Sequence, residues 1–251
     1  MSTTTRQNLK YAKRAVLDAL FPIFCLSCRT EGAWLCEKCF AELKILDFQV
    51  CPACEENITD KGFLCQNCRD SRISPLDGLI AAVSYEDPAV KKLVHNFKYR
   101  FVGDISRLLS KLLVKALVRN DFPLPDLIAF VPLHPKRLRW RGFNQSFLLA
   151  AHISKELAPL LNIDILDILE RKKYNQPQMN VKNYKERLQN VCNIFGLKPE
   201  VDPSLVKNKT FLLVDDIATT GATLQECAKI LKQAGAKKIY AAVIARQSLK
   251  K

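Results

Sequence analysis

Residues 211–224, F-L-L-V-D-D-I-A-T-T-G-A-T-L, constrain the fold of this chain more than any other segment. Four apolar residues predict a buried strand that ends at Val214, where Asp215 and Asp216 follow. A turn rich in Thr and Gly then leads into a helix expected over residues 222–234. Ligands of open α/β sheets bind at the carboxyl ends of strands. The segment therefore predicts a ligand site at this strand end.

The residue types in this segment favour a phosphate ligand. A turn of small residues at a helix N-terminus offers free backbone N–H groups and the positive end of the helix dipole. Thr219, Thr220 and Thr223 add hydroxyl donors, and Gly221 allows a close approach of the backbone. Two carboxylates beside an anion site require a ligand that also carries donors or a metal, as ribose 5-phosphate does. Thr and Asp are ordinary capping residues taken singly, but the full string is too specific for incidental caps.

The rest of the chain alternates between short apolar runs and helical patterns. We expect strands over residues 78–85, 127–131, 163–169, 210–214 and 238–245, and helices over 88–97, 104–119, 144–161 and 222–234. This alternation predicts an α/β fold with a mostly parallel sheet flanked by helices. Residues 7–20 have the spacing of a short amphipathic helix, whose apolar face is expected to pack on the protein itself rather than on a membrane or a partner.

Eight of the ten cysteines form four C-x-x-C pairs between residues 25 and 68. Each C-x-x-C turn presents two thiolates, so two turns complete one tetrahedral zinc site and the eight cysteines suffice for one or two structural Zn²⁺ ions. No thioredoxin-like βαβ pattern surrounds them, which argues against redox catalysis. The expected metal ligands are Cys25, Cys28, Cys36, Cys39, Cys51, Cys54, Cys65 and Cys68.

The pairing of the four turns is open in the sequence. Sequential pairing closes the shortest loops and is favoured over an interleaved cross-brace. Cys192 and Cys227 lie outside the cluster and are expected to be small buried apolar residues. Residues 70–77, with Pro75, are interpreted as a linker. The expected domains are thus a helix over 1–20, a zinc module over 21–70 and an α/β domain over 78–251.

The formal net charge is +14, and its distribution is uneven. Residues 1–70 hold nine Lys/Arg and nine Asp/Glu, whereas residues 71–251 hold thirty and sixteen. Such an excess favours phosphate-bearing partners, although a solvated basic surface explains it equally well. No apolar run is long enough for a transmembrane segment, and the basic N-terminus is too interrupted for a secretory signal. We expect a cytoplasmic protein, with peripheral attachment to the inner face of the membrane as the alternative.

The segment 211–224 resembles the motif that binds phosphoribosyl pyrophosphate (PRPP) in type I phosphoribosyltransferases. Three further strings narrow the resemblance: L-V-H-N-F-K-Y at 93–99, V-P-L-H-P-K-R-L-R-W-R-G-F-N-Q at 131–145 and E-R-L-Q-N at 186–190. With the C-x-x-C pairs, they make nearly the whole chain similar to the ComF family of competence-associated proteins. Two positions depart from that pattern: Ala218, where the family often has a bulkier residue, and Glu55, where it usually has glycine.

The resemblance implies a PRPP site with Mg²⁺. Asp215 and Asp216 would hold the ribose, Lys136 in the 131–136 loop would bind pyrophosphate, and the basic segment 171–187 would close over the ligand; these two acids and Lys136 are the expected catalytic residues. The implied PRPP-binding residues are Lys98, Leu133, His134, Lys136, Arg137, Arg171, Asp215, Asp216, Ala218, Thr219, Thr220, Gly221, Ala222 and Thr223.

A second interpretation is a non-catalytic factor that binds single-stranded DNA, with PRPP as a regulatory ligand. The resemblance points to natural transformation, and a basic groove could follow a DNA backbone. The nucleic-acid candidates are Arg139, Arg141, Lys172 and Lys173, with Trp140, Phe143 and Tyr174 as stacking residues that could equally belong to the core. A third, weaker alternative is a scaffold whose zinc module binds a competence helicase. Nothing in the sequence names the acceptor of a transferase reaction.

Overall fold

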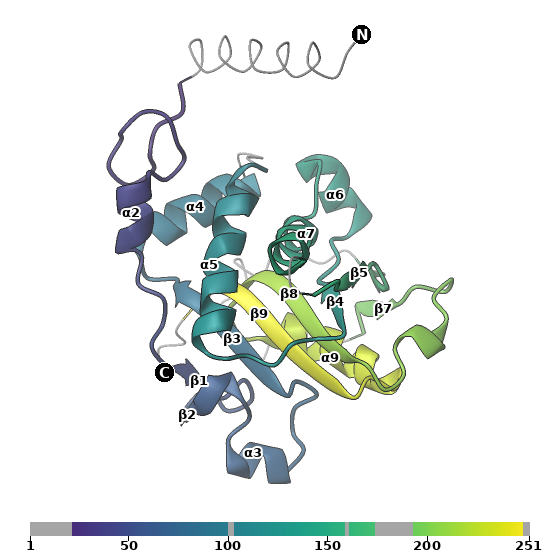
Figure 1. The fold of residues 1–251 in the computed structure, drawn as a ribbon. Coiled ribbons are helices and arrows are strands. Elements are labelled where there is room, and N and C mark those ends of the chain that lie inside the picture. Colours follow the sequence, from purple (N-terminus) through teal and green to yellow (C-terminus); the bar gives the residue numbers. More distant parts are fainter. Residues whose placement is uncertain (1–21, 100–102, 159–160, 174–192, 248–251) are drawn as a thin grey trace. The chain divides into compact units, whose positions relative to one another are not determined.

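The chain divides into two compact units, Met1–Lys44 and Ile45–Lys251, which we call unit 1 and unit 2. The computed structural model describes residues 22–99, 103–158, 161–173 and 193–247 (Figure 1). The helix expected over residues 7–20 lies outside these residues. In the described part of unit 1, the short helix α2 (Glu37–Glu42) follows a loop that a bridge between Phe24 and Glu31 closes. None of the helices in the described ranges is long and apolar enough to cross a membrane.

A five-stranded sheet forms the centre of unit 2, and all of its neighbouring strands are parallel. Its order is β3-β9-β8-β4-β5. Most of its side chains are buried, which explains why the strands are nearly continuous apolar runs. The expected parallel sheet is therefore confirmed. The strands are β3 (Gly78–Ser84), β4 (Leu127–Phe130), β5 (Asp164–Leu166), β8 (Thr210–Ala218) and β9 (Lys238–Arg246).

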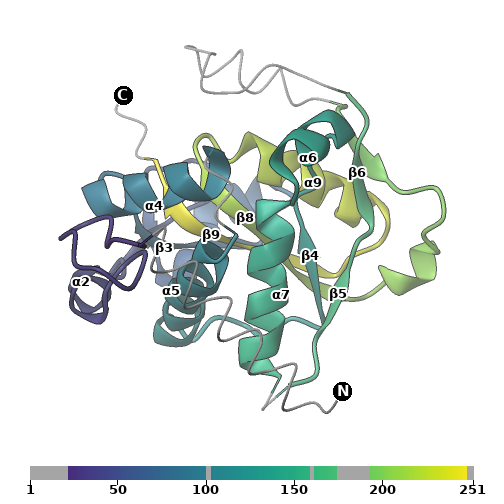
Figure 2. The ribbon, with the colours of Figure 1, turned by 90° about the horizontal axis from the view of Figure 1, so that it is seen from above.

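Helices cover both faces of this sheet. Three lie on one face: α4 (Pro88–Tyr99), α5 (Ile105–Arg119) and α7 (Gln145–Leu157). The opposite face carries α9 (Ala222–Gln233), as Figures 1 and 2 show. The apolar stripe of each helix packs into the core, which includes the fully buried rings of Phe97 and Phe211.

Several elements differ from the expectation. Strand β8 continues to Ala218 instead of ending at Val214, because β9 pairs with it as far as Arg246 and the acidic side chains leave this ladder intact. Residues 163–169 divide between β5 and a second strand, β6 (Leu169–Arg171), which pairs antiparallel with β7 (Phe195–Leu197).

The helix α6 (Pro135–Arg141) was not expected at all. It buries no side chain, so it has no apolar periodicity to reveal it. The sequence signals of α6 are the residues that begin and end the helix. His134 caps the first turn by accepting a hydrogen bond from the backbone N–H of Lys136, Pro135 stands at the first helical position, and Gly142 ends the helix with φ of 76°.

Residues 45–77 belong to unit 2 and pack on β3. They contain the strands β1 (Gln49–Val50) and β2 (Ile58–Thr59), the 3-10 turn η1 (Asp60–Gly62) and α3 (Gln66–Asp70). The buried Gln49 side chain donates to the carbonyl of Ala81 and accepts from its N–H, at 3.1 and 3.0 Å. Gly62 lies so close to β3 that a Cβ there would be 2.2 Å from the carbonyl oxygen of Leu79.

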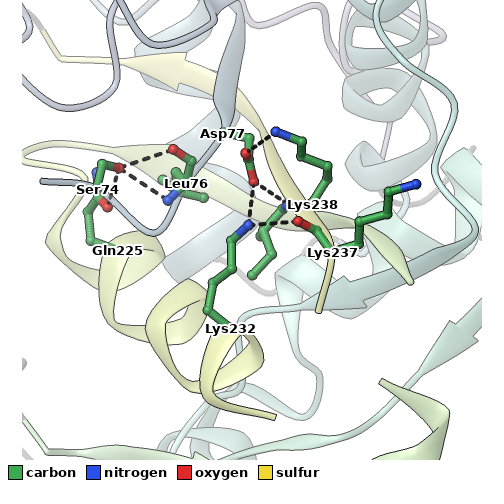
Figure 3. Close-up of polar contacts among 8 residues, drawn as sticks. Ser74, Leu76, Asp77, Gln225, Lys232, Lys237 and Lys238 are labelled. Carbon is green, nitrogen blue, oxygen red and sulfur yellow. Dashed lines mark hydrogen bonds and ion pairs between the residues drawn. The ribbon is translucent and has the colours of Figure 1, made fainter. Parts of the chain in front are cut away.

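The segment expected to be a linker, residues 70–77, is bound to the domain that follows it. Asp77 forms ion pairs of 2.8 Å with both Lys232 and Lys238, and its carboxylate accepts from the N–H of Ile239 (Figure 3). These contacts lower the pKa of Asp77 against the effect of its burial. Cys227 is buried, as expected, whereas Cys192 lies outside the described residues.

Candidate functional site

The two acids lie on the last part of β8 and are held differently. The carboxylate of Asp215 accepts hydrogen bonds from the hydroxyl of Ser146 on α7, at 2.8 Å, and from the N–H of Asp216, at 2.9 Å. Asp216 is buried and forms an ion pair of 2.8 Å with Lys98, at the end of α4. A cation from one helix and a hydroxyl from another therefore fix the pair.

This arrangement changes the protonation of Asp215. Burial and the neighbouring charge of Asp216 raise its pKa to about 7, and Lys98 opposes that rise only in part. Burial lowers the pKa of Lys98, but the carboxylate of Asp216 outweighs this effect, so the pKa of Lys98 is raised. Near neutral pH Asp215 is thus only partly ionised, whereas Lys98 keeps its proton.

The turn between β8 and α9 combines a left-handed glycine with threonine hydroxyls. Gly221, at the N-cap of α9, has φ of 66°, a left-handed conformation that favours glycine. The hydroxyl of Thr220 accepts from the N–H of Ala222 at 3.4 Å, and the side chains of Thr219 and Thr223 line a cavity in front of the turn. Ala218, Thr220 and Ala222 are buried beneath it.

The cavity has a volume of about 770 Å³ and is lined on one side by guanidinium groups. Burial lowers the pKa of Arg141, and burial together with Arg137 lowers that of Arg171 to about 10. The Nε atoms of Arg141 and Arg171 are buried without a hydrogen-bond partner. The guanidinium of Arg171 lies over the ring of Phe195, 5.4 Å from its centre. Two cations are thus withdrawn from water at the cavity, which favours an anionic ligand there.

Only some of the residues expected from the sequence line this cavity. Lys136 and Arg139 are exposed on α6, and His134 serves as the cap of that helix. Lys172 forms an ion pair of 3.6 Å with Glu170, and Lys173 is exposed. Tyr174 and the segment 174–187 lie outside the described residues. The expected residues that line the cavity are Lys98, Leu133, Arg137, Arg141, Arg171, Asp215, Asp216, Thr219 and Thr223.

Three aromatic residues of the lining were not expected, Tyr85, His95 and Tyr99, whereas Trp140 was among the stacking candidates. The rings of His95 and Tyr99 lie 5.1 Å apart. His95 and Tyr99 are four residues apart on α4 and could have been placed on one helix face from the sequence. Trp140, with 60% of its surface exposed, is available for contact, whereas Phe143 stacks on Phe97 in the core.

The cysteines form two clusters, and the favoured sequential pairing is confirmed. One holds Cys25, Cys28, Cys36 and Cys39, and the other Cys51, Cys54, Cys65 and Cys68, with the four sulfurs of each within 4.8 Å of one another. In a tetrahedral site with Zn–S bonds of about 2.3 Å, sulfurs lie about 3.8 Å apart. The distances from Cys28 to Cys36, 3.6 Å, and from Cys54 to Cys65, 3.9 Å, fit this value.

Hydrogen bonds favour the thiolate form of some, but not all, of these sulfurs. The N–H groups of Cys28 and Cys36 both point to the sulfur of Cys25 at 3.5 Å, and, although burial raises its pKa, they lower it to about 6. In the second cluster, the N–H of Cys68 and the Asn57 side chain lower the pKa of Cys65 to about 6. Both clusters fit structural zinc, with four sulfurs and no open position.

Comparison with known proteins adds the following matches. Residues 144–251 match the family model of the phosphoribosyl transferase domain. Competence protein F of Haemophilus influenzae is 31% identical over 235 residues, which cover 90% of this chain and 98% of the relative. DNA utilization protein YhgH of Escherichia coli K12 is 29% identical over 223 residues, 86% of this chain and 93% of the relative.

One solved structure of lower similarity is a glutamine PRPP amidotransferase from B. subtilis complexed with ADP and GMP. It has a TM-score of 0.36 and 18% identity, and it covers 55% of this chain and 26% of that one. The family model and the parallel sheet, rather than this superposition, identify the phosphoribosyltransferase-like fold.

Proposed function

Since this chain belongs to the ComF family of competence proteins, we propose that unit 2 binds PRPP with Mg²⁺ and transfers its phosphoribosyl group in DNA uptake or nucleotide metabolism. One observation carries the proposal: Arg141 and Arg171 keep buried Nε atoms without partners in the cavity that also holds the acidic pair. A buried cation without an anion is costly, so the cavity favours a ligand that brings negative charge. The acids require that the same ligand bring hydroxyl groups or a metal.

PRPP meets both requirements. The turn over residues 218–223 would hold the 5-phosphate through backbone N–H groups and the hydroxyls of Thr219 and Thr223. Asp215 and Asp216 would accept hydrogen bonds from the ribose hydroxyls. Lys98, Arg137, Arg141 and Arg171 would surround the pyrophosphate, with Leu133, His134 and Lys136 from the preceding loop and α6.

The proposed reaction is displacement of pyrophosphate from the anomeric carbon by a nucleophile. The C–O bond to pyrophosphate breaks through an oxocarbenium-like state, the bonding electrons leave with pyrophosphate, and the nucleophile forms the new bond. Stabilisation of the leaving group by the guanidinium groups is therefore the main contribution of the protein. Mg²⁺, when bound with the ligand, would neutralise part of the pyrophosphate charge.

Calorimetric titration with Mg²⁺ and PRPP tests the proposal. We expect binding by the wild type and its loss in Asp215→Asn/Asp216→Asn, whereas Asp164→Asn/Glu200→Gln removes the same charge from exposed positions and should bind normally. Arg171→Met keeps an apolar contact for Phe195 and should weaken affinity about tenfold, the value of one charge-assisted hydrogen bond. Lys173→Met, an exposed neighbour, is its control. Absence of binding by the wild type would refute the proposal.

Trp140 supports a second candidate, the binding of single-stranded DNA. Its exposed ring stands on α6 between Arg139 and Arg141, a pattern that suits base stacking beside backbone phosphates. Arg139→Glu should then weaken DNA binding and reduce its salt dependence while PRPP affinity stays the same. Equal DNA affinity of the variant and the wild type would eliminate this candidate.

A further inference from the structure

The second cysteine cluster contacts the helix that follows the turn over residues 218–223, which we call the phosphate loop because of its proposed ligand. Gln225 lies in the first turn of α9, and its Nε2 donates to the carbonyl of Pro52, between Cys51 and Cys54, at 3.0 Å. Its Oε1 accepts from the hydroxyl of Ser74 at 2.9 Å, as Figure 3 shows. One side chain of α9 thus contacts the chain both within the cluster and just after it.

An ion pair makes a second connection, closer to the loop itself. Glu55, directly after Cys54, lies 2.7 Å from the guanidinium of Arg246, and the two side chains are only 15% and 10% exposed. The contact is an ion pair rather than a directed hydrogen bond, because Nη2 of Arg246 has no partner in hydrogen-bond geometry. Arg246 pairs in register with Ala218, the last residue of β8. The Glu55 carboxylate also lies 4.0 Å from the position that a Cβ on Gly221 would occupy.

The backbone of Glu55 adopts a conformation that is unfavourable for a residue with a side chain. Its φ is 62°, the left-handed region that costs a non-glycine residue about 1 kcal/mol. Its N–H donates to the carbonyl of Cys51 at 3.0 Å, so the cysteine turn imposes this conformation. A side chain retained where glycine would be easier, and buried against a cation at the loop, suggests a functional reason for the strain.

We propose that the second cysteine cluster, when it holds its metal, positions the phosphate loop, and that Glu55 and Gln225 are the positioning residues. The cluster fixes the turn over residues 51–55, and through Arg246 and Gln225 this turn fixes the two sides of the segment 218–225. Without the metal, the phosphate loop would be less ordered. The ligand would then have to order the loop when it binds, and this cost would lower its affinity. The effect on ligand affinity rests on the proposed function, whereas the effect on the order of the loop does not.

Amide hydrogen exchange on the full-length, zinc-loaded protein without ligand tests the effect on the order of the loop directly. In Cys54→Ser, with one zinc equivalent left, peptides covering residues 217–224 should exchange about fivefold or more faster than in the wild type. Cys28→Ser removes the matched ligand from the cluster of unit 1 and should leave these peptides unchanged. Unchanged exchange in Cys54→Ser, with the zinc lost, would overturn the proposal.

A pair of neighbouring acids separates positioning from folding. Glu55→Gln removes the charge with little change of shape, and Glu56→Gln makes the same change at an exposed position. Both should keep two zinc equivalents, but only Glu55→Gln should accelerate exchange at 217–224 and weaken ribose 5-phosphate affinity about threefold to tenfold. Equal exchange in the two variants, or tighter ligand binding by Glu55→Gln, would refute the role of Glu55. Failure of the wild type to bind any phosphoribosyl ligand would refute the proposed function alone, since exchange is measured without ligand.

Discussion

Asp215 is the residue whose protonation depends most directly on its neighbours in the site. Its pKa of about 7 arises from burial and from the adjacent Asp216. An aspartate in an unfolded chain has a pKa of about 3.9, so between about pH 4 and 7 the folded protein keeps a proton that the unfolded chain has released. The stability that this proton contributes is complete below pH 4 and is lost as the pH rises through 7.

Asp215→Asn should therefore stabilise the ligand-free protein at alkaline pH. The amide retains a hydrogen bond with Ser146 and carries no charge, so we expect a free energy of unfolding about 1–2 kcal/mol higher at pH 8, and nearly the wild-type value at about pH 4. Denaturant unfolding at the two pH values, without Mg²⁺, measures the difference. Asp164→Asn, at an exposed position, should show no such pH dependence. A variant less stable than the wild type at pH 8 would contradict the assignment.

At the scale of elements, α6 carries two cationic residues of the cavity on a helix without a buried side chain. Its end depends on Gly142, at φ of 76°, and Arg141 just before it donates to Gln145 at 3.0 Å. The space around Gly142 is open, so the only cost of a side chain there is that of the backbone. The positions of Arg137 and Arg141 thus depend on the left-handed conformation of Gly142.

Substitution of Gly142 should weaken the proposed PRPP binding, and more strongly the less readily the new residue adopts a left-handed backbone conformation. Asn tolerates this region and should have little effect, whereas Val should cost about 1 kcal/mol at the helix end and lower affinity roughly threefold. Gly235, at φ of 95°, ends α9 at its far end from the phosphate loop and provides the control. Gly235→Val should lower the melting temperature without changing affinity. Calorimetry and thermal unfolding of the three variants test this prediction.

The sequence predicted most elements of the sheet and its flanking helices because apolar periodicity reports burial, and burial decides most of this fold. It missed α6, which packs nothing into the core, and it ended β8 too early, because pairing with β9 depends on a distant strand. The acids, the loop and the cysteine ligands were predictable as local strings. The unpaired Nε atoms of Arg141 and Arg171, and the contact of Glu55 with Arg246, were not, since tertiary packing alone creates them.

On the scale of the whole molecule, the two cysteine clusters belong to different units. Unit 2 includes the second cluster. The segment 45–77 that carries it is held on β3 by the hydrogen bonds of Gln49 and by the close approach of Gly62. Its metal is thus expected to contribute to the stability of the phosphoribosyltransferase-like domain itself. The metal of unit 1 is expected to stabilise only the local loop around its own ligands.

Elemental analysis should find two zinc equivalents in the full chain and one in Cys28→Ser or Cys54→Ser. Thermal unfolding should then separate the variants, because Cys54→Ser lowers the melting temperature of the main transition by several degrees, whereas Cys28→Ser leaves that transition unchanged. One zinc equivalent in the wild type, or an equal loss of stability in both variants, would contradict this assignment.

The order of the sheet has a consequence for synthesis on the ribosome. Strand β3 is the first of the sheet to emerge, yet its partner is β9, the last, with Gly78 beside Tyr240. Until β9 leaves the exit tunnel, the apolar edges of β3 and β8 have no partner, and such edges invite pairing with other chains. Nascent ComF chains arrested before β9 should therefore depend on chaperones, and the complete sheet can close only once β9 has left the tunnel.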